Sequence, residues 1–359
     1  MDARRAYQKT DVFLPELPVT AGIEITRNCN AKCRHCSAGL QSFHIAEPDQ
    51  KTMDRLVAEI MTLQPFQVDL FGGEPFLSRY FFPLAQYFQS QDISISASSN
   101  GAPVTQRLVD RLTTLDNISV IQISLDSLDP ASHDAFRGVP GLFERAVGAL
   151  EMLCASGITT GLSFTAHGQN VDELENVISF AHELGVASVS LSTYVATGDG
   201  DDALNLSASQ MRYVYDLCGR ARDRDYDGPS LATCTSYTAL LDPILQKSPL
   251  FTGCTAGKSA LLIRQNGDVI PCVHLDIVVG NCLNEPLVDI MTRAPLIVDM
   301  NDRNNLKGAC GSCDFKVKCG GCRARAYAAT GDPLAEDPGC FLPLMAREER
   351  AAALPLGET

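Results

Sequence analysis

The chain has 359 residues, of which 45% are hydrophobic, and this is enough to bury a sizeable core in about two domains. The formal net charge of −14 argues against a nucleic-acid backbone as partner, because that kind of binding depends on a basic surface. The sequence contains no apolar run of about 18 residues and no apolar signal-peptide core near its start. These features predict a cytoplasmic protein without a membrane span.

Short apolar strands alternate with segments of helical periodicity over more than half of the chain. Six strand–helix units in succession predict a parallel sheet covered by helices, and they fall short of the eight units of a complete barrel. We therefore expect an α/β fold with an open, partial (β/α)6 TIM-like barrel. The expected strands are residues 22–26, 68–71, 93–97, 120–125, 160–165 and 188–192, and the expected helices are residues 53–63, 80–89, 105–115, 142–156, 172–184 and 208–222.

The sequence also predicts a β-hairpin and the boundaries between the parts of the chain. Two apolar runs flank Asn266 and Gly267, which predicts a β-hairpin over residues 263–270 that carries Cys254 and Cys272 to one end. The predicted parts are a leader at residues 1–20, the partial barrel at 21–225, a connecting segment containing proline and glycine at 226–253, a small cysteine-rich domain at 254–345 and a tail at 346–359.

Fourteen cysteines are many for a chain without an export signal, and in a reducing compartment we expect metal ligands rather than disulfides. Directly after the first strand, Cys29, Cys33 and Cys36 have C-x₃-C-x₂-C spacing, which places three soft ligands in one loop. Three thiolates without an obvious fourth ligand suit a cubane iron–sulfur cluster with one open iron. The alternative is a structural zinc site with His35 as the fourth ligand.

The second strand is followed by Gly72, Gly73 and Glu74. In parallel α/β folds, the loops at the carboxyl ends of the strands build the functional site. The two glycines would let a ligand approach the backbone closely, and the glutamate is suited to a cation or an amine. The alternative is an ordinary turn.

Small polar residues also follow the next strands, and each has a structural alternative. Asn100 follows the third strand, whereas Ser124 and Asp126 end the fourth, where turn formation or helix capping also explains them. His167 follows the fifth strand and is a candidate acid or base, or the partner in a structural hydrogen bond.

A second group of cysteines lies in the C-terminal third. Cys254 and Cys272 have C-x₁₂-G-x₄-C spacing around Gly267. After a gap, a C-x₂-C-x₅-C-x₂-C run is followed by one further cysteine. By itself, the run fits a zinc ribbon, because paired C-x₂-C spacings are typical of structural zinc. These five cysteines are Cys310, Cys313, Cys319, Cys322 and Cys340.

Together, these motifs resemble those of the radical S-adenosylmethionine (SAM) enzymes that carry a C-terminal SPASM domain. The resemblance implies that Cys29, Cys33 and Cys36 hold a 4Fe-4S cluster whose open iron chelates SAM. Reductive cleavage of SAM would then give a 5′-deoxyadenosyl radical that abstracts hydrogen from a substrate. The resemblance also assigns SAM contacts to Gly72, Gly73, Glu74, Asn100, Ser124 and Asp126.

For the C-terminal cysteines, the resemblance implies two auxiliary iron–sulfur clusters, expected to be 4Fe-4S. The first lacks a fourth ligand, for which Cys282 is the nearest unassigned thiol. The sequence departs from the family in having two residues, rather than three, between Cys319 and Cys322. The implied ligands are Cys254, Cys272 and Cys322 for the first cluster, and Cys310, Cys313, Cys319 and Cys340 for the second.

The implied reaction is modification of a ribosomally made peptide by crosslinking, oxidation or epimerisation. One alternative is a dehydrogenase or epimerase that acts on a small molecule such as a sugar, an aminoglycoside or a tetrapyrrole, and another is a non-catalytic zinc-binding scaffold. An epimerase would need a thiol as hydrogen donor, and Cys154, Cys218 and Cys234 are available for this role unless they are buried structural cysteines. Expected partners are ferredoxin or flavodoxin as electron donor and a separate peptide-recognition protein.

Overall fold

The computed structural model describes residues 20–37, 46–197, 200–222 and 225–346. The predicted leader therefore lies almost entirely outside the described residues, as does nearly all of the predicted tail. In the described part, ten strands form one sheet. Their spatial order is β10 (Gly280–Asn281), β9 (Asp268–Ile270), β8 (Ala260–Ile263), β1 (Thr20–Thr26), β2 (Gln67–Gly72), β3 (Ser94–Ser99), β4 (Ile118–Ser124), β5 (Thr160–Ala166), β6 (Ser188–Thr193) and β7 (Ser230–Thr233).

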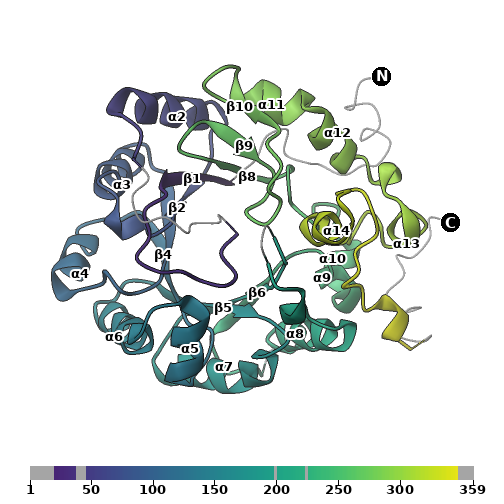
Figure 1. Ribbon diagram of the computed structural model, residues 1–359, viewed down its shortest axis with the longest axis horizontal. Helices are drawn as coiled ribbons and strands as arrows, with labels where there is room; N and C mark the ends of the chain where they lie inside the picture. The colour runs from purple at the N-terminus through teal and green to yellow at the C-terminus, as the bar shows by residue number, and fades with distance from the viewer. Residues whose placement is uncertain (1–19, 38–45, 198–199, 223–224, 347–359) are drawn as a thin grey trace.

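The strands from β8 through β1 to β7 pair in parallel, whereas β9 pairs antiparallel with both β8 and β10. The predicted α/β class with a parallel sheet is therefore confirmed. The outer layer is visible in Figure 1, where helices surround the curved sheet. These helices are α2 (Gln50–Thr62), α3 (Phe81–Ser90), α4 (Gln106–Leu112), α5 (Pro130–Arg137), α6 (Leu142–Ala155), α7 (Leu174–Glu183) and α8 (Ala208–Arg220).

Helix α2 illustrates why these segments fold as they do. The Asp49 side chain caps the helix by accepting a hydrogen bond from the Thr52 backbone N–H at 2.7 Å. Its inward face carries Met53, Leu56 and Ile60, at the spacing of a helical apolar stripe. Strand β1 is buried beyond its first residue, as expected for a parallel strand covered on both faces.

The sheet extends beyond the six predicted strands at both edges. Strand β7 lies inside the predicted connecting segment and pairs with β6. At the other edge, β8 of the predicted hairpin pairs with β1, with Leu261 opposite Ala21. The hairpin is therefore part of the main sheet, while the domain boundaries stay predictions. No helix in the described ranges is both long and apolar enough to cross a membrane.

Shorter helices complete the structure. In Figure 1, α14 is seen next to α9 and α10, and Arg325 of α14 contacts Tyr237, the residue before α9, at 3.5 Å. The α-helices are α9 (Thr238–Leu241), α10 (Pro243–Lys247), α11 (Leu287–Arg293), α12 (Pro295–Asn301), α13 (Gly308–Gly311) and α14 (Arg323–Thr330), and the 3₁₀ turns are η1 (Pro75–Leu77), η2 (Val171–Glu173), η3 (Asp202–Leu204), η4 (Arg303–Asn305) and η5 (Leu342–Leu344).

Candidate functional site

The loop that follows β1 contains Cys29, Cys33 and Cys36, all half-buried. Its backbone pairs with the end of α5, because the N–H groups of Lys32 and Arg34 donate to carbonyls at the end of that helix, at 3.0 and 2.9 Å. The Cys36 N–H donates to the Cys33 carbonyl at 3.2 Å and tightens the turn between these two cysteines. The three thiols therefore lie in one loop at the carboxyl edge of the parallel strands.

The Gly72–Gly73 pair packs directly against the backbone that leads into the cysteine loop. The Gly73 N–H donates to the Thr26 carbonyl at 2.9 Å, and the Glu74 N–H donates to the Asn28 carbonyl at 2.8 Å. A Cβ atom on Gly72 would lie 2.1 Å from the Thr26 oxygen, and one on Gly73 would lie 2.4 Å from the Asn28 oxygen. The close approach that requires glycine is that of the cysteine loop itself.

Glu74 and Asn100 connect the ends of β2 and β3 to the cysteine loop. The Asn100 N–H donates to Glu74 Oε2 at 2.8 Å, and the Phe76 N–H donates to Oε1 at 3.3 Å. The Asn100 side-chain amide reaches Asn30 Oδ1 at 2.7 Å and Cys29 Sγ at 3.9 Å. Burial raises the pKa of Glu74 to about 7, although these hydrogen bonds act in the opposite direction.

Asp126 is buried and holds an arginine that the sequence did not indicate. Arg137 Nε donates to Asp126 Oδ2 at 2.6 Å, and Arg137 Nη1 donates to Cys33 Sγ at 3.7 Å. The other carboxylate oxygen accepts the Thr165 N–H at 2.8 Å. Burial acts to raise the pKa of Asp126, but the Arg137 guanidinium, the His35 imidazole and the Thr165 hydrogen bond together outweigh it, and the pKa is lowered. Both oxygens thus have protein donors, so Asp126 positions Arg137 behind the cysteine loop.

Ser124 is half-buried at the last position of β4, where it pairs in register with Ser163. This placement puts it at the same edge of the sheet as Asn100 and Asp126.

The Phe136 ring lies between two imidazoles, stacked on that of His35 and tilted by 32° against that of His167. The centroids of His35 and Phe136 are 4.7 Å apart, and those of Phe136 and His167 are 4.5 Å apart. Burial lowers the pKa of His35 to about 3 and that of His167 to about 4, so both imidazoles are neutral. His167 Nδ1 accepts the Gln169 N–H at 3.2 Å, which is the structural alternative considered for this residue.

The C-terminal cysteines of the two predicted sets lie together. Cys322 is close enough to Cys272 for its charge to raise the pKa of the Cys272 thiol, and the charge of Cys254 acts in the same direction on both thiols. In the second set, the charge of Cys310 acts to raise the pKa of three other thiols, those of Cys313, Cys319 and Cys340. The charged neighbours of Cys282 are instead Glu59, Arg55 and Asp268. Among the described residues, no three His, Cys, Asp or Glu side chains could hold a single metal ion.

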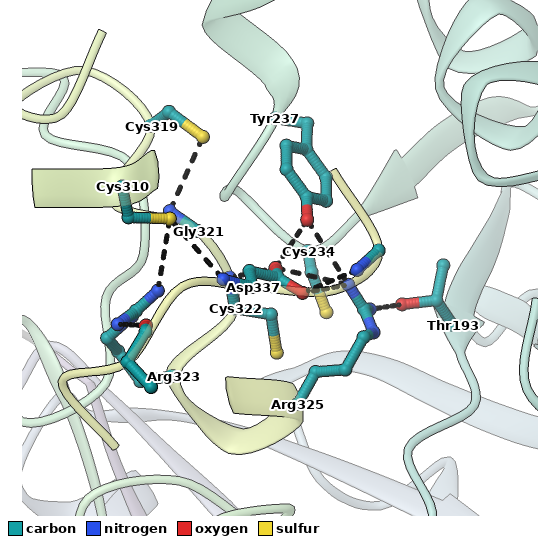
Figure 2. A network of polar contacts seen from close by, with 12 residues as sticks. Thr193, Cys234, Tyr237, Cys310, Cys319, Gly321, Cys322, Arg323, Arg325 and Asp337 are labelled. Carbon is teal, nitrogen blue, oxygen red and sulfur yellow. Dashed lines mark hydrogen bonds and ion pairs between the residues drawn. The ribbon is translucent and has the colours of Figure 1, made fainter. Parts of the chain in front are cut away.

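Asp337 connects the two sets of cysteines, as Figure 2 shows. Its carboxylate accepts hydrogen bonds from the Cys322 N–H and the Tyr237 hydroxyl, and its own N–H donates to Cys310 Sγ at 3.4 Å. Arg325 lies 3.3 Å from both carboxylate oxygens. A buried ion pair therefore lies beside thiols of both sets.

The remaining candidate thiols lie in two helices. Cys218 of α8 is 2% exposed and belongs to the hydrophobic core, where burial raises its pKa to about 11. Cys154 of α6 packs against the same core. Both positions fit the structural alternative.

Comparison with known proteins agrees with this arrangement. The model of the Radical SAM superfamily matches residues 23–181, and that of the SPASM iron–sulfur cluster-binding domain matches residues 254–314. Mycofactocin maturase MftC of Mycobacterium ulcerans is 31% identical over 94% of this chain and 92% of its own length. The AdoMet-dependent heme synthase of Methanosarcina barkeri is 28% identical over 92% of this chain and 98% of its own length.

The crystal structure of Streptococcus suis SuiB bound to the precursor peptide SuiA has a similar fold, with a TM-score of 0.75. The two chains are 20% identical, and the match covers 95% of this chain and 79% of SuiB. The chain thus belongs to the radical SAM superfamily. It is an enzyme with a C-terminal SPASM domain, and its cofactors are SAM and iron–sulfur clusters.

Proposed function

We propose that Cys29, Cys33 and Cys36 hold the 4Fe-4S cluster that binds SAM, and that Glu74 lies beside the SAM amino group. The main support for this proposal is the position of Asn100. Its backbone N–H binds Glu74, and its side-chain amide reaches Cys29 Sγ. One residue thus keeps the proposed cluster loop and the proposed amine-binding carboxylate together.

The contacts of the thiols suit metal-bound thiolates. Cys29 Sγ accepts the Ala31 N–H at 3.4 Å, and Cys33 Sγ accepts from Arg137. Such N–H donors stabilise negatively charged sulfur. Burial raises the pKa of Cys29 to about 11, so metal binding must displace the thiol proton. When bound, the cluster and SAM supply a 5′-deoxyadenosyl radical that removes hydrogen from the substrate.

The C-terminal cysteines form two further sets and are proposed to hold two auxiliary clusters. Ferredoxin or flavodoxin is the proposed electron donor. The buried Arg325–Asp337 pair lies between the sets and keeps Cys322 and Cys310 in fixed positions. The auxiliary clusters would exchange electrons with the substrate radical or shape its pocket.

The proposed substrate is a ribosomally made peptide, delivered with a separate recognition protein. The name of mycofactocin maturase and the SuiB structure with its precursor peptide support this class. A second candidate is a tetrapyrrole, which is favoured by the heme synthase of Methanosarcina barkeri, aligned over 98% of its own length. Mass spectrometry after incubation with SAM and each substrate class separates the two. A short open reading frame beside the gene would favour the peptide.

The core of the proposal predicts SAM cleavage by the anaerobically reconstituted and reduced protein. We expect 5′-deoxyadenosine from the intact chain and none from the variant in which Cys29, Cys33 and Cys36 are replaced by alanine. That variant should retain the iron of the C-terminal clusters, about eight atoms per chain for two 4Fe-4S clusters. An intact chain with its iron and sulfide verified, but without 5′-deoxyadenosine, would contradict the proposal.

Gly73→Ala should displace the cysteine loop, since the new Cβ meets the Asn28 carbonyl at 2.4 Å. We expect loss of about four iron atoms per chain and at least a tenfold drop in 5′-deoxyadenosine formation. Gly148→Ala is the matched control, because no atom lies within 4 Å of a Cβ at that helical glycine. Equal iron content in the two variants would show that the loop tolerates the extra methyl group.

A further inference from the structure

Cys234 lies outside every cysteine motif of the sequence, at the residue that follows β7. Its carbonyl accepts hydrogen bonds from the Tyr215 hydroxyl at 2.9 Å and from Thr238 Oγ1 at 3.4 Å. The residue is half-buried, and its position is fixed by side chains of α8 and α9. Cys234 is therefore a residue whose backbone is held in place and whose thiol has no role in the mechanism described above.

The neighbours of this thiol are the three proposed ligands of the first auxiliary cluster. Cys234 and Cys254 are close enough for their charges to interact, and both Cys272 and Cys322 are affected by the charge of Cys234. Figure 2 shows Cys234 and Cys322 beside each other, next to the Arg325 guanidinium. Four thiols from separate parts of the chain thus share one region.

Hydrogen bonds and one close backbone approach keep these segments together. Thr235 Oγ1 donates to the Gly253 carbonyl at 2.7 Å, which joins the residue after Cys234 to the residue before Cys254. Gly253 has a φ of +69°, and a Cβ there would lie 2.1 Å from the Cys319 carbonyl oxygen. The Gly257 N–H donates to the carbonyl of Pro271, the residue before Cys272, at 3.1 Å. These contacts hold the segments that carry Cys234, Cys254 and Cys272 close to one another.

We propose that Cys234 is the fourth ligand of the first auxiliary cluster, with Cys254, Cys272 and Cys322. This rests on the proposed function, in which those three cysteines hold that cluster. Cys234 replaces Cys282 in this role, because Cys282 is surrounded by Glu59, Arg55 and Asp268. With four thiolates, the cluster has no open iron for the substrate, and its role is electron transfer. Arg325 offers the positive charge that balances part of the thiolate charge.

The test uses the full chain with Cys29, Cys33 and Cys36 replaced by alanine, so that only the auxiliary clusters remain. To this background we add Cys234→Ala or Cys234→Ser. Cys282→Ala and Cys218→Ala are the controls, since both of these cysteines are buried and neither is an assigned ligand in this proposal. Iron and sulfide per chain and the electron paramagnetic resonance (EPR) spectrum after reduction are measured before and after addition of cyanide, which binds open iron sites.

In the background variant, cyanide should leave the EPR spectrum unchanged. Cys234→Ala should lose one to four iron atoms per chain or acquire a spectrum that responds to cyanide, as expected for an open iron. Both control variants should match the background. If Cys234→Ala does not fold, Cys234→Ser tests the assignment instead. A hydroxyl ligand should retain the iron and alter the EPR g values of one cluster.

Two results would overturn the proposal. One is a cyanide response in the background variant, because a cluster with four thiolate ligands has no vacant site. The other is a Cys234 variant with the same iron content, g values and cyanide response as Cys218→Ala. If the chain with its native cysteines still forms 5′-deoxyadenosine, either result overturns the assignment of Cys234 alone. Absence of 5′-deoxyadenosine from that chain would instead overturn the proposed function.

Discussion

Arg137→Met is expected to destabilise the protein by about 3–5 kcal/mol, because it leaves the Asp126 carboxylate buried without its counter-charge. Asp126 is 1% exposed and would keep only the Thr165 N–H as a donor among the contacts described above. The thermal midpoint of the reconstituted protein should fall by about 5–10 °C at a fixed scan rate. The cluster at Cys33 should also become harder to reduce, since its sulfur loses an N–H donor and a nearby positive charge.

Arg220→Met is the matched control for this prediction. Arg220 pairs with Glu175 at 3.1 Å, but both side chains are about 60% exposed, so the loss should be at most about 1 kcal/mol. Combining Arg137→Met with Asp126→Leu should recover stability, because no unpaired charge is then buried. The reduction potential of the cluster at Cys33 should stay low, because the Arg137 donor is still absent. Equal midpoints for the two single arginine variants would show that the buried pair contributes no more than a surface pair.

The six central strands could be predicted because each is a short apolar run followed by a helical segment. Strand β7 was missed because it has only four residues and follows Gly228 and Pro229, which indicate a loop. Pairing of β8 with β1 joins residues about 240 positions apart, and no local pattern indicates a contact of that kind. Helix α5 was also missed, although Asp129 and Pro130 at its start and Gly138 at its end are ordinary helix boundary signals.

Candidate site residues could be predicted where they belong to a motif of fixed spacing. They could not be predicted where only the fold brings distant residues together. Glu74 was a candidate because it follows two glycines at the end of a strand, and Asn100 connects it to Cys29 in the structure. Arg137 contacts a thiol 104 positions away, and in the sequence it is simply a basic residue in the last turn of a helix. Cys234 is an isolated cysteine, and only the fold brings it to Cys322.

Asp337→Ala should have the largest effect in the C-terminal region. The Asp337 side chain is fully buried, and its loss leaves the Arg325 guanidinium without a counter-charge, at a cost of about 3–5 kcal/mol. The Cys322 N–H and the Tyr237 hydroxyl lose their acceptor as well. We expect incomplete iron at both auxiliary sites, measured as iron per chain in the variant that lacks Cys29, Cys33 and Cys36.

Asp289→Ala is the matched control, because Asp289 forms an exposed pair with Arg293 and its loss should cost at most about 1 kcal/mol. Combining Asp337→Leu with Arg325→Met removes both buried charges and should restore much of the thermal midpoint. Iron should remain low in this double variant, because the Cys322 N–H still lacks its acceptor. Full iron content would show that the carboxylate only neutralises Arg325. Low iron with a recovered midpoint would show that Asp337 positions the cysteine ligands.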